Sequence, residues 1–359
     1  MDAILHATSR NQRIVELMRQ PAERRDVPWV RDAAQQAILL ELATLPPYLC
    51  GKWSIDDSGD GQVFDTLRTI IFDEMSHLGL ACNLLTTIGG TPQLADAALV
   101  PTYPGPLPGG VRPKLTVSLS GLTKESVTMY AEIEKPDDPV TERQETPHTS
   151  IGAFYTAILE ALRASPELII GARQIEMDMS SHGAGNSLVA LTSLAKVESA
   201  IEVIKEQGEG TSASPENPFP GTQGELAHYF AFLEIQHGRK LVHPPGYPNK
   251  WDFQGPEVPM PHALPMGVVP AGGWPRTGPS APAPATVQLL DEFNRAFSKL
   301  LGLLQDAWKE DDGSQALDTL NEAVVAMFGL QIPAQDLMAI PLPDGSGKTY
   351  GPEFRFVSA

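Results

Sequence analysis

The chain has 359 residues and 42% hydrophobic residues, so it is long enough to bury a core and too apolar for a disordered protein. Acidic residues outnumber basic ones by 44 to 26, which gives a formal net charge of −18. Nucleic-acid binding requires a basic surface, so this charge argues against a nucleic-acid partner. No apolar run approaches the ~20 residues that cross a bilayer, and the N-terminus lacks a signal-peptide pattern. We therefore expect a cytoplasmic protein with no membrane partner, and reduced, buried thiols at Cys50 and Cys82.

The first two helices are expected at residues 28–45 and 62–88. Pro46 and Pro47 should stop or kink the first. In the second, apolar residues recur at alternating steps of three and four, as on the buried face of a helix, and Gly89 follows its end.

Two stretches rich in proline and glycine, at 101–113 and 243–284, predict irregular structure. Between them we expect a short strand in "KLTVSL" (114–119) and helices at 123–134, 150–163, 186–208 and 223–241. Two more helices are expected at 286–309 and 315–330. The predicted organisation is a helical bundle in residues 1–245, with an insertion at about 90–185, and a wrapping segment with C-terminal helices in residues 246–359 that pack on the bundle.

Titratable residues interrupt the apolar faces of these helices in a repeated pattern. "FDEMSHLGL" places Glu74 three residues before His77, and "FLEIQH" places Glu234 three residues before His237. Each pair follows a helix with an acid on its inward face. That acid is Glu41 for the first pair, and Glu198 or Glu202 for the second.

Buried carboxylates are costly unless cations balance them. One Glu from each of two helices and a Glu-x-x-His pair from each of two others form the ligand set of a carboxylate-bridged dimetal site in a four-helix bundle. We therefore predict a pair of iron or manganese ions, which suit mixed carboxylate and imidazole ligands. The predicted ligands are Glu41, Glu74, His77, Glu202, Glu234 and His237.

The ligand from the third bundle helix stays open, because patterning favours Glu198 and spacing favours Glu202. Glu209 and His228 are further candidates, either as ligands or as groups that line the site. The other histidines singled out, His148, His182, His243 and His262, are expected to be structural or solvated.

Several longer motifs carry a resemblance to a known family. They include "AILLELATLPPYLCGKWSI", "DEMSHLGLACNLLTTIGGTPQL", "PTYPGPLPGGVRPKL", "IEKP", "HTSIGAFY", "IKEQGEGT", "HYFAFLEIQHGRKL" and "GPEF". Together they resemble the ferritin-like domain associated with iminophenyl-pyruvate dimer synthases of violacein- and indolocarbazole-type pathways. The resemblance implies a mainly α ferritin-like four-helix bundle with long insertions and a di-iron centre. Since those synthases are much longer chains, we do not expect this chain to dimerise an indole-derived imine.

Three functions are open at this point. A dimetal oxidase or oxygenase would act on a small organic metabolite, with dioxygen as its second substrate and a homodimer as a candidate assembly. An iron-oxidising or iron-storage protein would need no organic substrate. A ferritin-like scaffold would bind no metal and catalyse nothing.

Overall fold

The computed structural model describes residues 12–56, 61–136, 150–179, 187–210, 214–219, 224–247, 250–278 and 281–358. The structure described is mainly helical, and its β contacts are isolated bridges, including one between Gly105 and Val117 within the segment expected to hold a short strand. No helix in these ranges is both long enough and apolar enough to span a membrane. Cys50 and Cys82 are buried free thiols, as expected.

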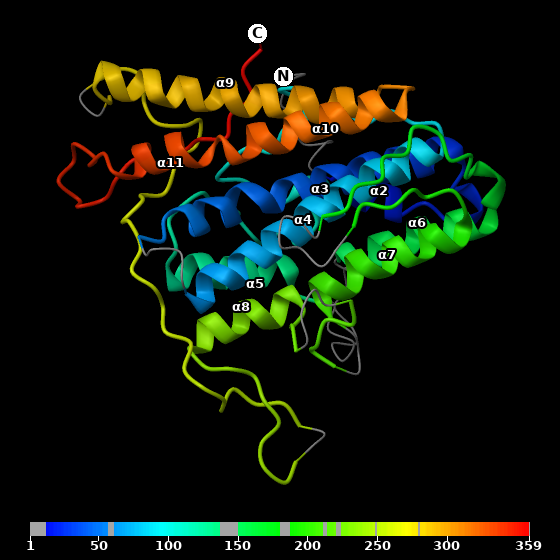
Figure 1. Ribbon diagram of the computed structural model, residues 1–359, viewed down its shortest axis with the longest axis horizontal. Coiled ribbons are helices and arrows are strands. Elements are labelled where there is room, and N and C mark those ends of the chain that lie inside the picture. The colour runs from blue at the N-terminus through cyan, green and yellow to red at the C-terminus, as the bar shows by residue number, and fades with distance from the viewer. Residues whose placement is uncertain are drawn as a thin grey trace.

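Two long helices, α3 (Val27–Trp53) and α4 (Gln62–Thr87), pack side by side at the centre of the molecule (Figure 1). Asp26 caps α3, because its side chain accepts a hydrogen bond from the backbone N–H of Trp29 at 3.1 Å. After α4, Gly89 takes a left-handed φ of 72°, and the helix ends there. The middle of both helices is buried, so any polar group on their facing sides lies away from water.

Helix α3 continues through Pro46 and Pro47 to Trp53, so the expectation that these prolines stop the helix is wrong. Pro47 has no N–H, and the carbonyl of Ala43 therefore loses its partner in the helix. The hydroxyl of Tyr103 donates to that carbonyl at 2.8 Å instead. Tertiary hydrogen bonding thus compensates for the helix-breaking residue.

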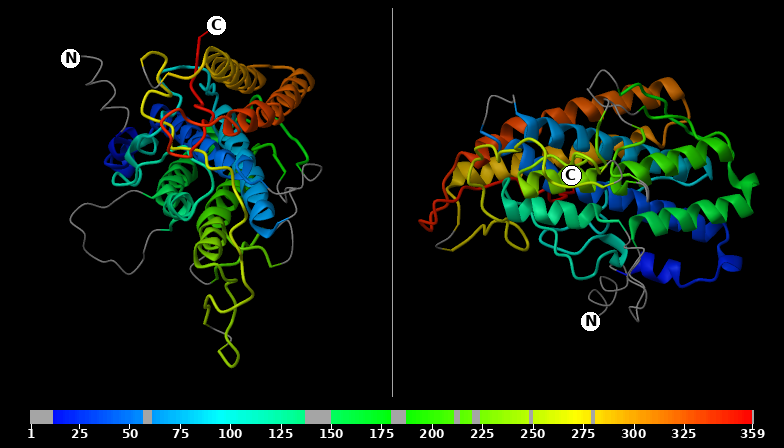
Figure 2. Two further views of the ribbon diagram at one scale, coloured as in Figure 1. Left: turned by 90° about the vertical axis from the view of Figure 1, so that its left-hand side faces the viewer. Right: turned by 90° about the horizontal axis from the view of Figure 1, so that it is seen from below.

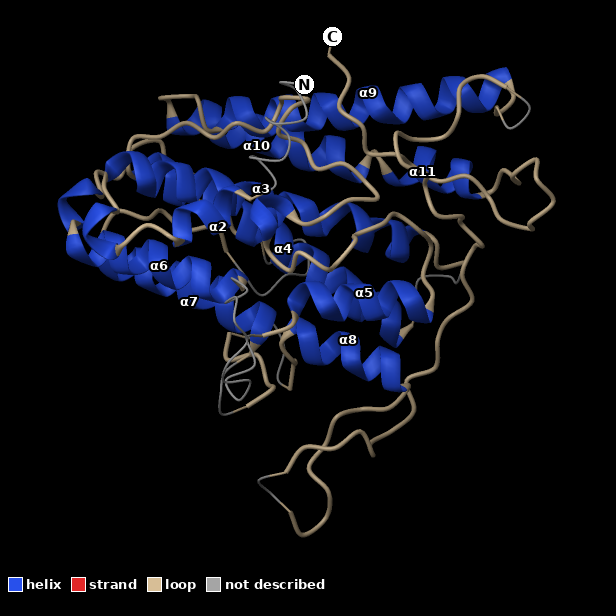
Figure 3. Ribbon diagram, turned by 180° about the vertical axis from the view of Figure 1, so that it is seen from behind, coloured by secondary structure: helices blue, strands red, loops and turns tan. Residues whose placement is uncertain are grey.

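The other two sides of the bundle are each made of two shorter helices that lie end to end (Figure 1, Figure 3). One side holds α5 (Lys124–Glu134) and α6 (Ile151–Ala164), and the other holds α7 (Leu194–Glu209) and α8 (His228–His237). The sequence predicted both α5 and α6, but it placed the starts of α7 and α8 at 186 and 223, too early. Gly210, at φ 77°, caps α7 and begins the interruption before α8.

A third layer covers the face of α3 and α4 that points away from α5–α8 (Figure 1, Figure 2). It consists of α9 (Pro284–Ala307), α10 (Gly313–Phe328) and α11 (Gln331–Met338). The first two match expectation, whereas α11 and the short N-terminal helix α2 (Arg13–Met18) were not predicted.

The segment before α9 runs in irregular structure and meets the C-terminal tail at one buried carboxylate. Glu353 is 3% exposed and accepts hydrogen bonds from the backbone N–H of Trp274 at 2.6 Å and the amide of Asn294 at 2.7 Å. Arg276 lies 2.8 Å from the same side chain and balances its charge. This cluster ties the tail to α9.

Replacement of Glu353 by Gln should lower the free energy of unfolding by about 3 kcal/mol, because it leaves Arg276 without its buried partner. Urea denaturation followed by circular dichroism measures this loss. A matched control is Glu257→Gln, which breaks an exposed pair with Arg239 and should cost less than about 1 kcal/mol. Equal losses in the two variants would contradict the anchoring role of Glu353.

Candidate metal centre

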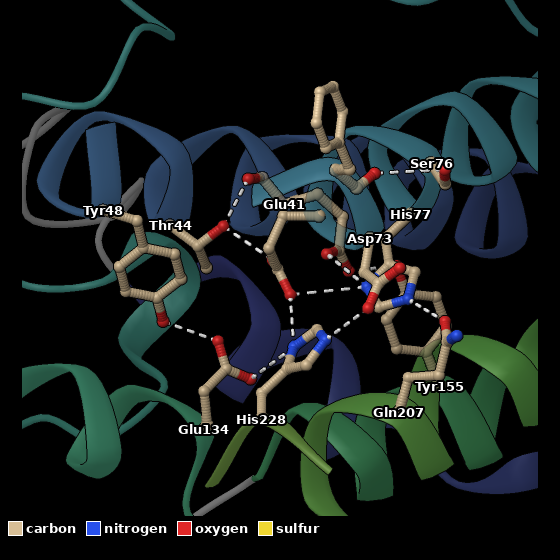
Figure 4. A network of polar contacts seen from close by, with 12 residues as sticks. Glu41, Thr44, Tyr48, Asp73, Ser76, His77, Glu134, Tyr155, Gln207 and His228 are labelled. Atoms are coloured by element: carbon tan, nitrogen blue, oxygen red, sulfur yellow. Dashed lines mark hydrogen bonds and ion pairs between the residues drawn. The ribbon is translucent and has the colours of Figure 1, made fainter. Parts of the chain in front are cut away.

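Three of the residues predicted as ligands lie together between α3 and α4. Glu41 comes from α3 and His77 from α4 (Figure 4). Glu74 lies one turn before His77 on α4. All three are at most 4% exposed. Nδ1 of His77 lies 3.5 Å from Oε1 of Glu74 and 3.9 Å from Oε2 of Glu41. The hydroxyl of Thr44 donates to the other oxygen of Glu74 at 2.7 Å, which fixes the orientation of that carboxylate.

The interruptions of the two broken sides bring two further ligand candidates to Glu74. Glu134 is the last residue of α5, and His228 is the first residue of α8. Nδ1 of His228 lies 3.0 Å from Oε1 of Glu74 and 3.9 Å from Oε2 of Glu134. Glu74 therefore belongs to two groups of potential ligands, one with Glu41 and His77 and the other with Glu134 and His228.

The proton on each imidazole is fixed at Nε2 by a partner outside the two groups. Nε2 of His77 lies 2.8 Å from the amide oxygen of Gln207, whose own NH₂ donates to the carbonyl of Phe219. Nε2 of His228 lies 3.2 Å from the carboxylate of Asp73. With Nε2 donating, each Nδ1 faces carboxylate oxygens and is the nitrogen that would bind a proton or a metal ion (Figure 4).

Such an arrangement is stable only if a cation lies between the imidazole and the carboxylates. The cation is either a proton on Nδ1 or a metal ion. Nδ1 of His228 is buried and has no hydrogen-bond partner, although Oε1 of Glu74 is 3.0 Å away. Two atoms bound to one ion through bonds of ~2.1 Å are themselves roughly 3.0–3.4 Å apart, so this spacing without hydrogen-bond geometry fits shared ligation of a metal.

A small cavity separates the ligand candidates. It has a volume of about 20 Å³ and its walls include Glu41, Glu74, His77 and Glu134. One water molecule needs roughly 10–15 Å³ of such space, so the cavity admits a small ion. In each of the two groups, one ligand atom per residue lies within 4.8 Å of the others. The residues present fit a metal.

Two tyrosines hold the outer oxygens of the terminal carboxylates. The hydroxyl of Tyr155 donates to Oε1 of Glu41 at 2.6 Å, and the hydroxyl of Tyr48 donates to Oε1 of Glu134 at 2.5 Å. The opposite oxygen of each carboxylate is the one that faces a histidine. The tyrosines therefore orient the ligand oxygens inward, as carboxylate partners commonly do around metal sites.

The shifted pKa values show how strongly the cluster needs positive charge. Burial, together with the charge of Glu74, raises the pKa of Glu41 to about 7 and that of Glu134 to about 8. Burial alone would raise the pKa of Glu74, but His228 and His77 hold that pKa below its ordinary value. Burial lowers the pKa of His77, yet Glu74 and Glu41 outweigh it and raise that pKa to about 9. Protons supply the balancing charge where no metal is bound, and metal binding would displace them.

The other three predicted ligands do not reach this cluster. Glu202 is exposed on α7. Glu234 is buried, but its carboxylate pairs with Lys240 at 2.5 Å and accepts the backbone N–H of Leu241 at 2.7 Å. His237 is exposed, and its ring stacks on Phe253. The prediction treated residues 186–208 and 223–241 as two antiparallel helices of the bundle, whereas α7 and α8 lie end to end on one side of it (Figure 1). His228, at the start of α8, therefore lies at the level of Glu74, and Glu234 lies about 9 Å further along the axis.

Of the alternative ligand candidates, one lies in the cluster and the others make contacts elsewhere. His228 joins the cluster, whereas Glu198 pairs with Arg163 at 2.6 Å. Glu209 accepts a hydrogen bond from the backbone N–H of Gly152 at 3.0 Å. The ring of His243 packs against that of Trp251 in a tilted arrangement, and His262 is an exposed residue beside Asp56. His148 and His182 lie outside the described residues.

The sequence contained a signal for Glu134, which was not predicted, and a second signal for His228, which was predicted only as an alternative candidate. "ELAH" places Glu225 three residues before His228, the same Glu-x-x-His spacing as in the pair at 74 and 77. Glu134 lies within the motif "IEKP", directly before a proline-containing segment that ends a helix. Both residues lie at helix ends, where a side chain does not belong to the apolar face of a continuous helix.

A family model described as ferritin-like matches residues 34–237, which include all five residues of the cluster and more than half of the chain. The chain belongs to the ferritin-like family. Among solved structures, a ferritin-like protein from Caulobacter vibrioides superposes with a TM-score of 0.56 and 20% sequence identity, over 85% of this chain and 96% of that one. At this identity the likeness shows the ferritin-like fold alone. No curated protein matches the sequence.

Replacement of Asp73 by Ala should lower metal affinity about 10–100-fold, because His228 loses the partner that keeps its proton on Nε2. A competition titration with a fluorescent chelator measures the affinity. Asp65→Ala is the matched control, since Asp65 lies in the first turn of α4 and pairs with Arg68. Unchanged affinity in Asp73→Ala would show that Asp73 does not orient a ligand.

Proposed function

We propose that this ferritin-like protein is a dimetal oxidase or oxygenase that acts on a small organic molecule with dioxygen. The observation that carries the proposal is that Glu74 is shared by two Glu–His ligand groups whose Nδ1 atoms point at carboxylates. One ion would be held by Glu41, Glu74 and His77, and the other by Glu74, Glu134 and His228. Mixed carboxylate and imidazole ligands favour iron, with manganese as the alternative.

When bound, a pair of reduced iron ions supplies electrons to dioxygen. The chain itself keeps water away, since the ligand candidates are at most 6% exposed. Tyr48 and Tyr155 hold the carboxylates of Glu134 and Glu41 in one orientation. Thr44 does the same for the shared carboxylate of Glu74, so the other oxygen of that carboxylate, Oε1, is held between the two histidines.

A cleft beside the cluster supports an organic substrate. Its volume is about 650 Å³, which lies within the range of small-molecule pockets. It lies between the first half of α4 and the start of α8, and its walls include Thr66, Thr69, Asp73 and His228. His228 thus belongs both to the wall of the cleft and to one ligand group, and its partner Asp73 lines the cleft beside it. The sequence resemblance to the domain of iminophenyl-pyruvate dimer synthases also favours an organic metabolite of secondary metabolism.

Iron oxidation without an organic substrate is the second candidate. The same cleft carries acidic side chains at Asp65, Glu225 and Glu234. Acidic walls attract Fe(II) electrostatically and raise its local concentration. The two functions differ in stoichiometry. An oxidase with two ions should oxidise about two Fe(II) per chain in the absence of substrate, whereas an iron-storage protein should continue with every further addition. An oxygen electrode with stepwise Fe(II) addition distinguishes them, and continued oxidation with mineral formation would contradict the oxidase.

The ligand assignment predicts which variants lose metal. Glu134→Gln and His228→Ala should each reduce the bound iron from about two ions to about one per chain, because each removes a ligand from one group only. Glu234→Gln and His237→Ala should keep the wild-type content, since these residues lie outside the cluster. Elemental analysis after anaerobic Fe(II) loading gives the counts. Loss of iron in Glu234→Gln with retention in Glu134→Gln would overturn the assignment.

A further inference from the structure

An apolar cavity of about 90 Å³ lies between the central helix pair and the outer layer. One wall comes from α3 and α4, at residues that include Leu45 and Phe72. The other wall comes from α9 and α10, with Leu301 and Met327 among its residues. The family match ends at residue 237, so the outer wall belongs to a part of the chain beyond the ferritin-like match.

The lining of this cavity offers almost nothing to hydrogen-bond. Ser76 is its one hydroxyl-bearing side chain, and that hydroxyl donates back to the carbonyl of Phe72 at 3.1 Å. A water molecule needs two to four polar partners, so a cavity of this kind stays dry. Charged and polar ligands are excluded for the same reason.

The size of the cavity restricts the occupant further. A dry apolar cavity of about 150 Å³ admits benzene or xenon. At about 90 Å³ this one is smaller and suits a gas molecule better than a ring compound. Four methionines, Met75, Met177, Met179 and Met327, line it, and their flexible side chains let the walls adapt to a small apolar guest.

The cavity lies directly behind the ligand-bearing segments. Met75 and Ser76 line it, and in the sequence they fall between Glu74 and His77. On α3, Leu42 lines it and is the neighbour of Glu41. The two helices therefore present the ligand groups on one face and the cavity on the other, and one helix diameter, about 10 Å, separates the two sites.

We propose that this cavity holds dioxygen for the metal centre. Dioxygen is small, uncharged and apolar, so it enters a dry apolar cavity more readily than water. Dioxygen held there raises its local concentration beside the ligand-bearing segments. This role depends on the proposed oxidase or oxygenase function, whereas gas binding by the cavity does not.

Xenon tests the cavity without any metal or turnover. Xenon-pressurised crystals, or xenon NMR, of the metal-free full chain should show one xenon between α4 and α10. Ala323 lines the cavity and is fully buried, so Ala323→Leu should abolish this site, while Leu320→Ala on the same wall should retain or enlarge it. Ala326→Leu, also on α10 but outside the cavity lining, is the matched control. Absence of xenon from the wild type overturns the proposal.

Oxygen dependence tests the role of the cavity. In the Fe(II)-loaded chain, Ala323→Leu should slow iron oxidation at least about threefold at low dioxygen and leave the limiting rate at high dioxygen unchanged. Circular dichroism confirms that the variant is folded, and the control variant Ala326→Leu should not slow the reaction at low dioxygen. Xenon binding with an unchanged oxygen dependence overturns the dioxygen role. If the Fe(II)-loaded wild type consumes no dioxygen, both the proposed oxidase function and the dioxygen role of the cavity are wrong. Dioxygen consumption by the wild type is measured before any variant is made, so this outcome is distinct from failure of the cavity role alone.

Discussion

The structure of the site depends on one buried carboxylate. Glu74 is 2% exposed and lies between the Nδ1 atoms of two histidines, whose opposite nitrogens are already engaged by Gln207 and Asp73. A carboxylate buried in this way requires positive charge close by. The two Nδ1 positions define where that charge must lie. This requirement explains why α3, α5 and α8 each bring a ligand candidate to one turn of α4.

The interruptions of the bundle are part of the site. If either broken side were one continuous helix, only side chains on the flank of that helix would reach the level of Glu74. Instead α5 ends at Glu134 and α8 begins at His228, so helix ends supply one ligand candidate from each broken side. Around them, Tyr48 and Tyr155 hold the outer carboxylate oxygens. The outer layer of α9 and α10 then covers the opposite face of α3 and α4 and encloses the apolar cavity.

Periodicity in the sequence was sufficient for the mainly helical fold and for three of the five residues of the cluster, Glu41, Glu74 and His77. The apolar steps around Glu74 and His77 identify α4 and its inward face, and the same reasoning finds Glu41 on α3. Prediction from periodicity failed where the chain departs from a continuous helix. Glu234 occupies an inward position, but a local pair with Lys240 balances its charge. Pro47 was expected to break α3, and only the distant hydroxyl of Tyr103 explains why it does not. Neither contact can be read from local pattern.

Anomalous X-ray scattering at the iron edge from anaerobically loaded crystals tests the central claim most directly. We predict two peaks, one beside Nδ1 of His77 and one beside Nδ1 of His228, with the carboxylate of Glu74 between them. A peak beside Glu234 or His237, or no peak between the two Nδ1 atoms after loading, would contradict the account.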